Sequence, residues 1–255
     1  MEIHMYSKFE LTIAFVGVLA VTGAGPIIAQ ETTCDTIPVA CGNNCSDEVL
    51  TYDRSILQTS VFRKDAVAPL NPLAYPVQAV NFTGHTAWAA GKEGHTVVLS
   101  RDLWFTVEPE LKIICNKFPA DTTIPKLHKV LGLKPATTAD AGRQFVLFTI
   151  EKEEPVGPTG HGAFRPCADP DPAATQCGND LKGPPQYLEW FTRNMVSSYK
   201  VDPNMSDTGY PWTRLGYTFN WDKTSSDHRG AQEYVVPAGT SVRIRAVVSP
   251  AEYCR

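Results

Sequence analysis

The sequence lacks a strong excess of charge and lacks the common catalytic signatures. Among 255 residues, Lys and Arg number 23 and Asp and Glu number 27, which gives a net charge of −4. A mildly acidic balance argues against nucleic-acid binding through charge. No Gly-x-Ser-x-Gly elbow, Walker loop, Gly-x-Gly-x-x-Gly fingerprint or His-Glu-x-x-His pair occurs in the chain. Hydrolases with a serine elbow, nucleotide kinases and common zinc proteases are therefore disfavoured.

Long apolar runs are also missing, except near the N-terminus. Lys8 precedes an apolar run over residues 11–24, and the small residue Ala29 precedes a polar stretch. This order is typical of a secretory signal peptide, and the run is shorter than the roughly 20 residues that a membrane span needs. We expect a signal peptide over 1–29, cleaved near Ala29 or at Ala24. The mature chain is then secreted and extracellular, without membrane attachment.

The seven cysteines all follow this leader, and in a secreted chain they favour disulfides over metal binding. Cys41 and Cys45 have a metal-like spacing, but no nearby His or second Cys pair completes a four-ligand site. No Cys-x-x-Cys-His haem attachment occurs either. We therefore expect no metal. The cysteines are Cys34, Cys41, Cys45, Cys115, Cys167, Cys177 and Cys254.

The positions of these cysteines suggest some pairings and leave others open. Cys167 and Cys177 enclose a loop rich in Pro and Asp, so we expect them to pair locally. Cys254 stands next to the C-terminus and is expected to tie the tail to the body, with Cys115 as the candidate partner. The first three cysteines would close an N-terminal arm. Because seven is odd, one thiol is free or pairs with another chain.

Three Asn-x-Ser/Thr sequons suggest a glycoprotein, provided that the host glycosylates its exported proteins. The acceptor residues are Asn44, Asn81 and Asn204.

The remaining pattern predicts an α+β fold with a mainly antiparallel sheet, about three short helices and disulfide staples. Residues 30–75 form an irregular, cysteine-rich arm, and residues 76–255 form the α+β domain. Strand-like and helix-like segments mix without a βαβ rhythm, which favours antiparallel pairing. Helices are expected over 110–117, 126–131 and 186–199, and strands over 96–100, 103–107, 144–151, 215–221, 233–236 and 241–248.

The last two expected strands flank a Pro-x-Gly turn at residues 237–239 and are interpreted as a hairpin. In the second of them, Val242 and Ile244 alternate with Arg243 and Arg245. This period of two predicts a buried apolar face and an exposed charged face.

One segment carries a family resemblance. From Glu233 to Thr240 the chain reads Glu-Tyr-Val-Val-Pro-Ala-Gly-Thr. This resembles the last motif of ADP-ribosyltransferase-like and NAD-glycohydrolase domains, where a Glu opens a strand that ends in Pro-x-Gly-Thr. The family also has an Arg at the end of an early strand, which Arg101 matches. Its middle motif, an aromatic followed by small hydroxyl residues, is similar to Tyr217-Thr218 and to residues 224–226.

The resemblance implies a secreted NAD-consuming enzyme, a hydrolase or transferase acting as a toxin or effector, with NAD as substrate and no further cofactor. Glu233 would stabilise the cationic transition state and Arg101 would hold the NAD phosphates. Tyr217 and Thr218 would line the pocket, and Trp212 and Trp221 are further candidates for stacking on nicotinamide. Ala231 replaces an acid of arginine-modifying members, which favours NAD hydrolysis or another acceptor.

Two other functions stay open at this point. A non-catalytic secreted effector or binding protein would contact a host protein through the aromatic and basic segment 210–214. A secreted ribonuclease would need a base and an acid close together, for which His228 and Glu233 are candidates.

Overall fold

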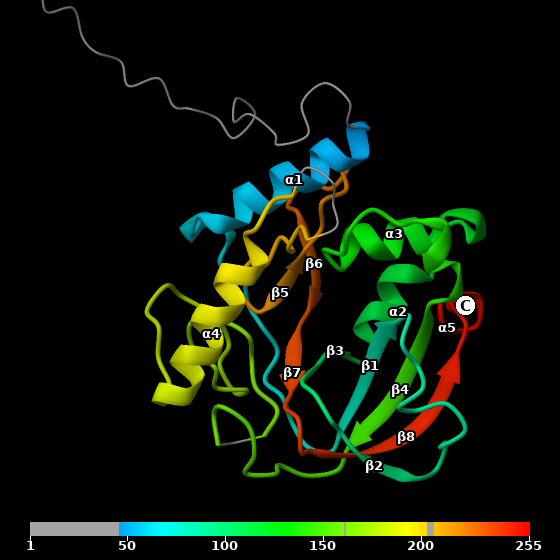
Figure 1. The fold of residues 1–255 in the computed structure, drawn as a ribbon, viewed down its shortest axis with the longest axis vertical. Coiled ribbons are helices and arrows are strands. Elements are labelled where there is room, and N and C mark those ends of the chain that lie inside the picture. The colour runs from blue at the N-terminus through cyan, green and yellow to red at the C-terminus, as the bar shows by residue number, and fades with distance from the viewer. Residues whose placement is uncertain (1–45, 161, 203–206) are drawn as a thin grey trace, which may run out of the picture. The chain divides into compact units, whose positions relative to one another are not determined.

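A six-stranded sheet forms the centre of the described chain (Figure 1). The computed structural model describes residues 46–160, 162–202 and 207–255. The expected signal peptide, Asn44, Asn204 and the first three cysteines lie outside these ranges and stay predictions. The sheet has the strand order β2-β8-β4-β1-β3-β7, and each of its pairings is antiparallel. Its strands are β1 (Val77–Thr83), β2 (Thr96–Val98), β3 (Leu103–Val107), β4 (Gln144–Ile150), β7 (Tyr234–Val236) and β8 (Ser241–Val248).

In the described part of the chain, five α-helices and a two-stranded sheet accompany this central sheet, which confirms the predicted α+β class. The small sheet pairs β5 (Tyr217–Phe219) with β6 (Arg229–Gln232). The predicted helices are present with small shifts of their ends. The helices are α1 (Asp47–Ser60), α2 (Glu110–Cys115), α3 (Thr123–Val130), α4 (Pro185–Ser198) and α5 (Pro250–Tyr253). Within the described ranges, no helix is long and apolar enough to cross a membrane.

The nearly continuous apolar run of β4 is buried on both faces, as the sequence predicts. Val146, Phe148 and Ile150 pack into one core cluster with β8 and β3. Phe145 points the other way, into a second cluster formed with α2 and α3. Alternation along a strand thus supplies both cores at once. As a result, α2 and α3 lie beside β1, whereas α4 packs near β7 (Figure 1).

Two disulfides join the four cysteines that the structure describes, and both match the expected pairings. Cys115 at the end of α2 is bonded to Cys254 after α5, which ties the C-terminus to the body. Cys167 is bonded to Cys177 within the long loop before α4.

One correction concerns the arm, because residues 47–60 form a helix where an irregular segment is expected. Ser46 accepts a hydrogen bond from Val49 N (3.3 Å) and so caps α1. Tyr52 and Ile56, four residues apart, are fully buried, and Tyr52 packs on Trp221. The helix also buries polar Asp53, Ser55 and Thr59. These polar positions hide the apolar period that normally marks an amphipathic helix.

A second correction concerns the expected hairpin. β7 pairs with β3 at one edge of the sheet, while β8 pairs with β4 and β2. The Pro-x-Gly turn therefore sends the chain across the sheet and does not fold it back on itself. The alternation in β8 is as expected, since Val242 and Ile244 are buried and Arg243 and Arg245 are exposed.

Candidate functional site

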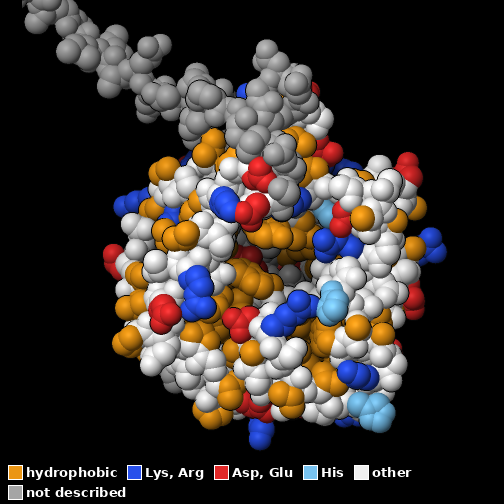
Figure 2. Space-filling model, in the orientation of Figure 1, with side chains coloured by type: hydrophobic (Ala, Val, Ile, Leu, Met, Phe, Trp, Pro, Cys, Tyr) orange, Lys and Arg blue, Asp and Glu red, His pale blue; other side chains and the backbone are white. Residues whose placement is uncertain are grey.

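A cavity of about 390 Å³ opens between α4 and β5 on one side and β1, β3 and the chain after α3 on the other. Figure 2 shows the hollow with hydrophobic side chains on its walls. Glu233 is the only acidic or basic side chain among the described residues that line it. The lining consists of Val80, Asn81, Phe82, Trp104, Phe105, Thr106, Leu111, Leu131, Gly132, Leu133, Asn194, Ser197, Ser198, Tyr210, Pro211, Trp212, Thr218, Phe219 and Glu233.

Glu233 is held between β6 and β7, where its backbone N–H donates to Gly216 O (3.0 Å). Its side chain is 7% exposed. Burial raises the pKa of the carboxyl to about 8, although the Trp212 indole N–H and the Arg165 guanidinium act to lower it. The Trp212 contact falls short of a formed hydrogen bond, and Glu233 Oε1 has no hydrogen-bond partner. At neutral pH this carboxyl is therefore mostly protonated.

Two further polar atoms in the cavity wall lack partners. Trp212 is 4% exposed, and its Nε1 has no acceptor. Asn81, on the central strand β1, donates from Nδ2 to Trp104 O (2.8 Å), but its Oδ1 has no donor. The Trp212 indole N–H lies beside the Glu233 carboxyl, so two of these atoms belong to one pair and Asn81 Oδ1 is the third.

A buried cation, Arg165, acts on this site electrostatically. It is fully buried, and its Nη2 donates to Asn71 O (2.6 Å) and to the Tyr234 hydroxyl (3.0 Å). Its charge also acts on Glu110, whose pKa is raised by burial despite a hydrogen bond from Gln232 N (3.0 Å) to its Oε1. Arg165 thus stabilises the ionised forms of both carboxyl groups without lining the cavity.

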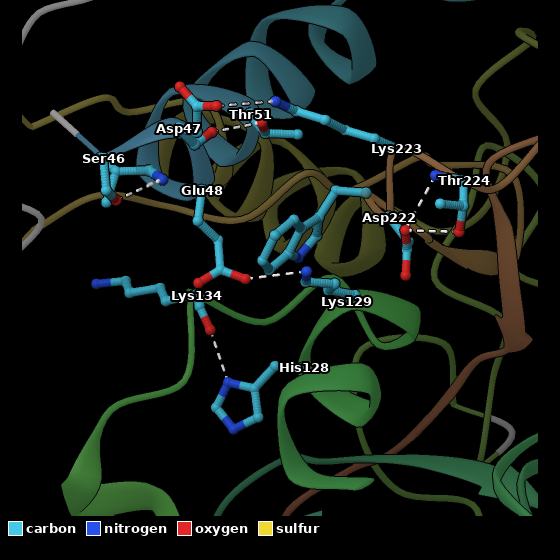
Figure 3. Close-up of polar contacts among 12 residues, drawn as sticks. Ser46, Asp47, Glu48, Thr51, His128, Lys129, Lys134, Asp222, Lys223 and Thr224 are labelled. Carbon is cyan, nitrogen blue, oxygen red and sulfur yellow. Dashed lines mark hydrogen bonds and ion pairs between the residues drawn. The ribbon is translucent and has the colours of Figure 1, made fainter. Parts of the chain in front are cut away.

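The wall after α3 is anchored by several contacts (Figure 3). His128 Nδ1 bonds Lys134 O (2.6 Å), and Lys129 forms an ion pair with Glu48 of α1 (3.0 Å). Trp221 donates its indole N–H to Leu133 O (2.9 Å). At Gly132 the backbone has φ +65°, and a side chain would meet Phe219 O at 3.3 Å. This glycine therefore allows the wall to approach β5 closely.

Two cations lie against aromatic rings of the cavity. The Lys134 ammonium is 6.0 Å from the centre of the Tyr210 ring, and the Arg143 guanidinium is 5.6 Å from that of Phe82. Arg143 also bonds Asp140 (2.7 Å). These contacts place positive charge next to an apolar, aromatic pocket.

The structure brings together only part of the predicted site. Glu233, Trp212 and Thr218 line the cavity. Tyr217 faces a different hollow, and Trp221 supports the wall without lining it. Arg101 is exposed between β2 and β3 and is not among the described lining residues, so the structure does not bring it to Glu233.

The second hollow, of about 240 Å³, contains His228. The His228 ring stacks on Phe219 (5.1 Å) and its Nδ1 contacts Asn220 O (2.9 Å). Because His228 and Glu233 line different hollows, the acid and base of the ribonuclease hypothesis are not assembled.

Segment 210–214 does not form the exposed surface that a protein partner would need. Pro211, Trp212 and Thr213 are buried, and only Tyr210 is exposed. Arg214 donates to Ser60 O (3.0 Å) at the end of α1. The Asn81 side chain, a predicted glycosylation site, lies in the cavity wall, and its Nδ2 donates to Trp104 O.

Sequence reasoning missed Asn81 as a wall residue, Trp104 and Arg165. Asn81 was visible only as a sequon, Trp104 only as a strand residue, and Arg165 stands in the loop before Cys167 without a motif. The contacts that define their roles connect residues far apart in sequence, such as Asn81 with Trp104 and Arg165 with Tyr234.

Searches against protein-family models, curated proteins and solved structures return no match for this chain. Within the described parts of the chain, no group of three or more His, Cys, Asp or Glu side chains is placed to hold a metal ion.

Proposed function

We propose that the chain is a secreted NAD-consuming enzyme, an NAD glycohydrolase or a related ADP-ribosyltransferase, with Glu233 as its catalytic carboxylate. One observation carries the proposal: a buried carboxyl group with an unpartnered oxygen lies in a cavity with aromatic walls. The nicotinamide end of NAD is flat and positively charged. Aromatic faces and a single carboxylate attract such a group, and more strongly when water is excluded.

The reaction breaks the bond between ribose C1′ and the nicotinamide ring nitrogen. The bonding electron pair goes to the ring, neutral nicotinamide leaves, and the ribose becomes an oxocarbenium-like cation. The Glu233 carboxylate stabilises this cation as it develops. Water then adds to C1′ and loses a proton, which gives ADP-ribose.

The charge state of Glu233 links binding to pH. Before NAD binds, the carboxyl is mostly protonated at pH 7, because burial raises its pKa to about 8. A cationic ring beside it favours the ionised form and lowers this pKa. Binding of NAD below pH 8 therefore releases a proton, and the carboxylate is formed where it is needed.

The size of the cavity suits one end of NAD. A volume of about 390 Å³ is near the lower end of the roughly 300–1,000 Å³ of ligand pockets. Nicotinamide and its ribose would occupy it, and the pyrophosphate would lie outside. Lys134 and Arg143 lie beside aromatic rings of the wall and are our candidates to hold it, whereas the predicted phosphate ligand Arg101 does not line the cavity.

Hydrolysis is favoured over transfer to a protein arginine. Ala231, which replaces the additional acid of arginine-modifying relatives, is fully buried. Its backbone N–H donates to Thr218 Oγ1 (3.0 Å). A buried alanine presents no group to a protein acceptor, so water is the acceptor that we propose.

Incubation of the purified mature chain with NAD, followed by chromatography, tests the proposal. We expect equal amounts of nicotinamide and ADP-ribose from the wild type and almost none from Glu233→Gln. Glu110→Gln is the matched control, because this carboxyl also lies near Arg165 but does not line the cavity. Wild-type protein that leaves NAD intact at high concentration would overturn the proposal and favour the non-catalytic binding protein.

A further inference from the structure

We propose that Arg165 is a positioning residue of the reaction, which fixes the strand on either side of Glu233 and supplies the buried positive charge that favours the Glu233 carboxylate. The proposal deepens the proposed function, on which it rests for the role of Glu233. Arg165 is not among the described residues that line the cavity, so it acts through Glu233 and not on the substrate.

The side chain of Arg165 packs against both segments that hold the backbone of Glu233. Its guanidinium lies over the ring of Tyr234, the next residue in the chain (4.5 Å to the centroid), and its Nη2 donates to the Tyr234 hydroxyl (3.0 Å). On the other side, the Glu233 N–H donates to Gly216 O (3.0 Å). Gly216 has φ +79°, and a Cβ there would meet Arg165 Cδ at 3.0 Å. The glycine therefore allows Arg165 to lie this close.

The backbone of Asn71 completes the network around Glu233. Asn71 O accepts from Arg165 Nη2 (2.6 Å) and from the Tyr234 hydroxyl (2.6 Å). Asn71 N–H donates to Gln232 Oε1 (2.7 Å). Gln232 and Tyr234 are the two chain neighbours of Glu233. Because both are bonded to Asn71 beside the Arg165 guanidinium, this network fixes the strand on either side of Glu233.

The burial of Arg165 points to a use of its charge. The side chain is fully buried, and within the described parts of the chain its Nε and Nη1 have no hydrogen-bond partner. A buried cation that is incompletely hydrogen-bonded is costly, and apolar side chains of similar volume often replace such groups without loss of stability. Packing alone therefore does not account for an arginine here. A nearby cation does favour the ionised form of a carboxyl group.

The other titratable groups around this pair do not supply positive charge. Arg165 acts on Tyr234 and Glu110, and Glu233 acts on Tyr199 at the end of α4. Burial raises the pKa of both tyrosines, so they stay neutral at pH 7, and Glu110 is an acid. Among the described groups that act on the Glu233 carboxyl, Arg165 is the cation.

A titration of the glutamate carboxyl carbons by ¹³C NMR tests the charge effect without NAD. The Glu233 signal is the one lost in Glu233→Gln, and its midpoint in the wild type should lie at about pH 8. Arg165→Gln can still donate to Asn71 O but has no charge, and should raise the midpoint by about one pH unit or more. Arg165→Lys, which keeps the charge, should stay near the wild type.

Arg229→Met is the matched control for the loss of one positive charge. Its guanidinium also lies over a tyrosine ring, that of Tyr217 (5.8 Å), but in the smaller hollow. We expect its Glu233 midpoint to equal that of the wild type. An unmoved midpoint in Arg165→Gln, or the same shift in Arg229→Met, would overturn the proposal.

The pH profile of turnover separates the charge of Arg165 from a general effect on the fold. In Arg165→Gln, kcat/KM should fall roughly tenfold at pH 7 and recover above about pH 9, because Glu233 ionises later. A loss by the same factor at every pH would contradict the proposed role. If Arg165→Gln does not fold, Arg165→Met takes its place in both measurements.

The two measurements also distinguish this proposal from the proposed function. A chain that leaves NAD intact but shows the shifted Glu233 midpoint would reject the function and support the action of Arg165 on Glu233. Cleavage of NAD with an unmoved midpoint would do the reverse.

Discussion

The two hollows on either side of β5 differ in how their polar groups are satisfied. In the smaller hollow, Arg63 pairs with Asp65, and Arg229 lies near Asp227 (3.9 Å) and over the Tyr217 ring. None of the described buried polar atoms that lack a partner belongs to it. The larger hollow has three such atoms, on Glu233, Asn81 and Trp212.

This difference indicates which hollow is built for a ligand. A hollow whose charges are already paired gains little from binding, since a new contact must replace an existing one. An unpartnered buried group costs stability of about 1–3 kcal/mol, which a ligand can recover on binding. The charged hollow has the larger number of titratable residues, but the aromatic cavity is the better candidate site.

The largest expected effect is the change in the free energy of unfolding with pH. Its size tests whether the Glu233 carboxyl is buried without a partner. Its pKa rises from an ordinary 4.5 to about 8 in the folded chain. Between these values the folded chain binds more protons than the unfolded one, so the free energy of unfolding falls as pH rises. The loss is on the order of 5 kcal/mol across the window.

Urea unfolding at pH 5 and pH 8.5 measures this loss. Glu233→Gln should lack it, while contributions from other groups, such as Asp53 with its pKa raised to about 6 by burial, remain in both proteins. Identical pH dependence in the variant and the wild type would show that Glu233 is solvated or paired.

The next effect is on turnover. Glu233→Gln should lower kcat for NAD by about a hundred- to a thousandfold, or roughly 2.7–4 kcal/mol, because an amide does not offset a developing cation. In the wild type, kcat/KM should rise about tenfold per pH unit up to about pH 8 and then level off, since the free enzyme must ionise Glu233. A profile that is flat from pH 6 to 8 would contradict the assigned role.

The two disulfides of the described residues are expected to differ in how much each stabilises the fold, and this difference is smaller than the effects of Glu233. Cys115 and Cys254 are 139 residues apart, whereas Cys167 and Cys177 are 10 apart. Because loop-closure entropy grows with loop length, replacing the first pair by Ser should cost about 2 kcal/mol more than replacing the second. Chemical denaturation of the two double variants measures the difference. A greater loss from the short loop would show that local packing, not chain entropy, dominates.

The smallest effect is expected in the charged hollow. His228→Gln should change NAD turnover less than twofold and stability by about 0.5 kcal/mol or less, as for most surface substitutions. A large loss of activity would break the comparison, because it would move the functional site to the second hollow.

The sequence predicts which segments form helices and strands better than it predicts which strands pair with each other. The double-sided burial of β4 and the alternation of β8 follow from local apolar patterns. The pairing of β7 with β3 does not, because a Pro-x-Gly turn has the same local chemistry in a hairpin and in a crossing connection. The buried polar face of α1 similarly conceals the helix.

The candidate site is predictable only where a motif marks it. Glu233 is found through its resemblance to a strand-opening Glu. The acceptor role of Asn81 depends on a bond to Trp104, 23 positions away, and Arg165 is defined by contacts to Asn71 and Tyr234. Contacts between residues so far apart in the chain produce no recognisable motif or spacing pattern in the sequence. Arg101 stands before Thr218 and Glu233 in the sequence, as the resemblance requires, but it does not line the cavity.

The most direct test of the central claim is to observe the five indole N–H signals of the ¹⁵N-labelled chain while nicotinamide is added. Trp212 has an unpartnered Nε1 in the cavity, whereas Trp221 donates to Leu133 O and lies outside it. The account predicts a large shift of the Trp212 signal, a smaller one for Trp104, and an unchanged Trp221. A Trp212 signal that does not shift when nicotinamide is added would contradict it.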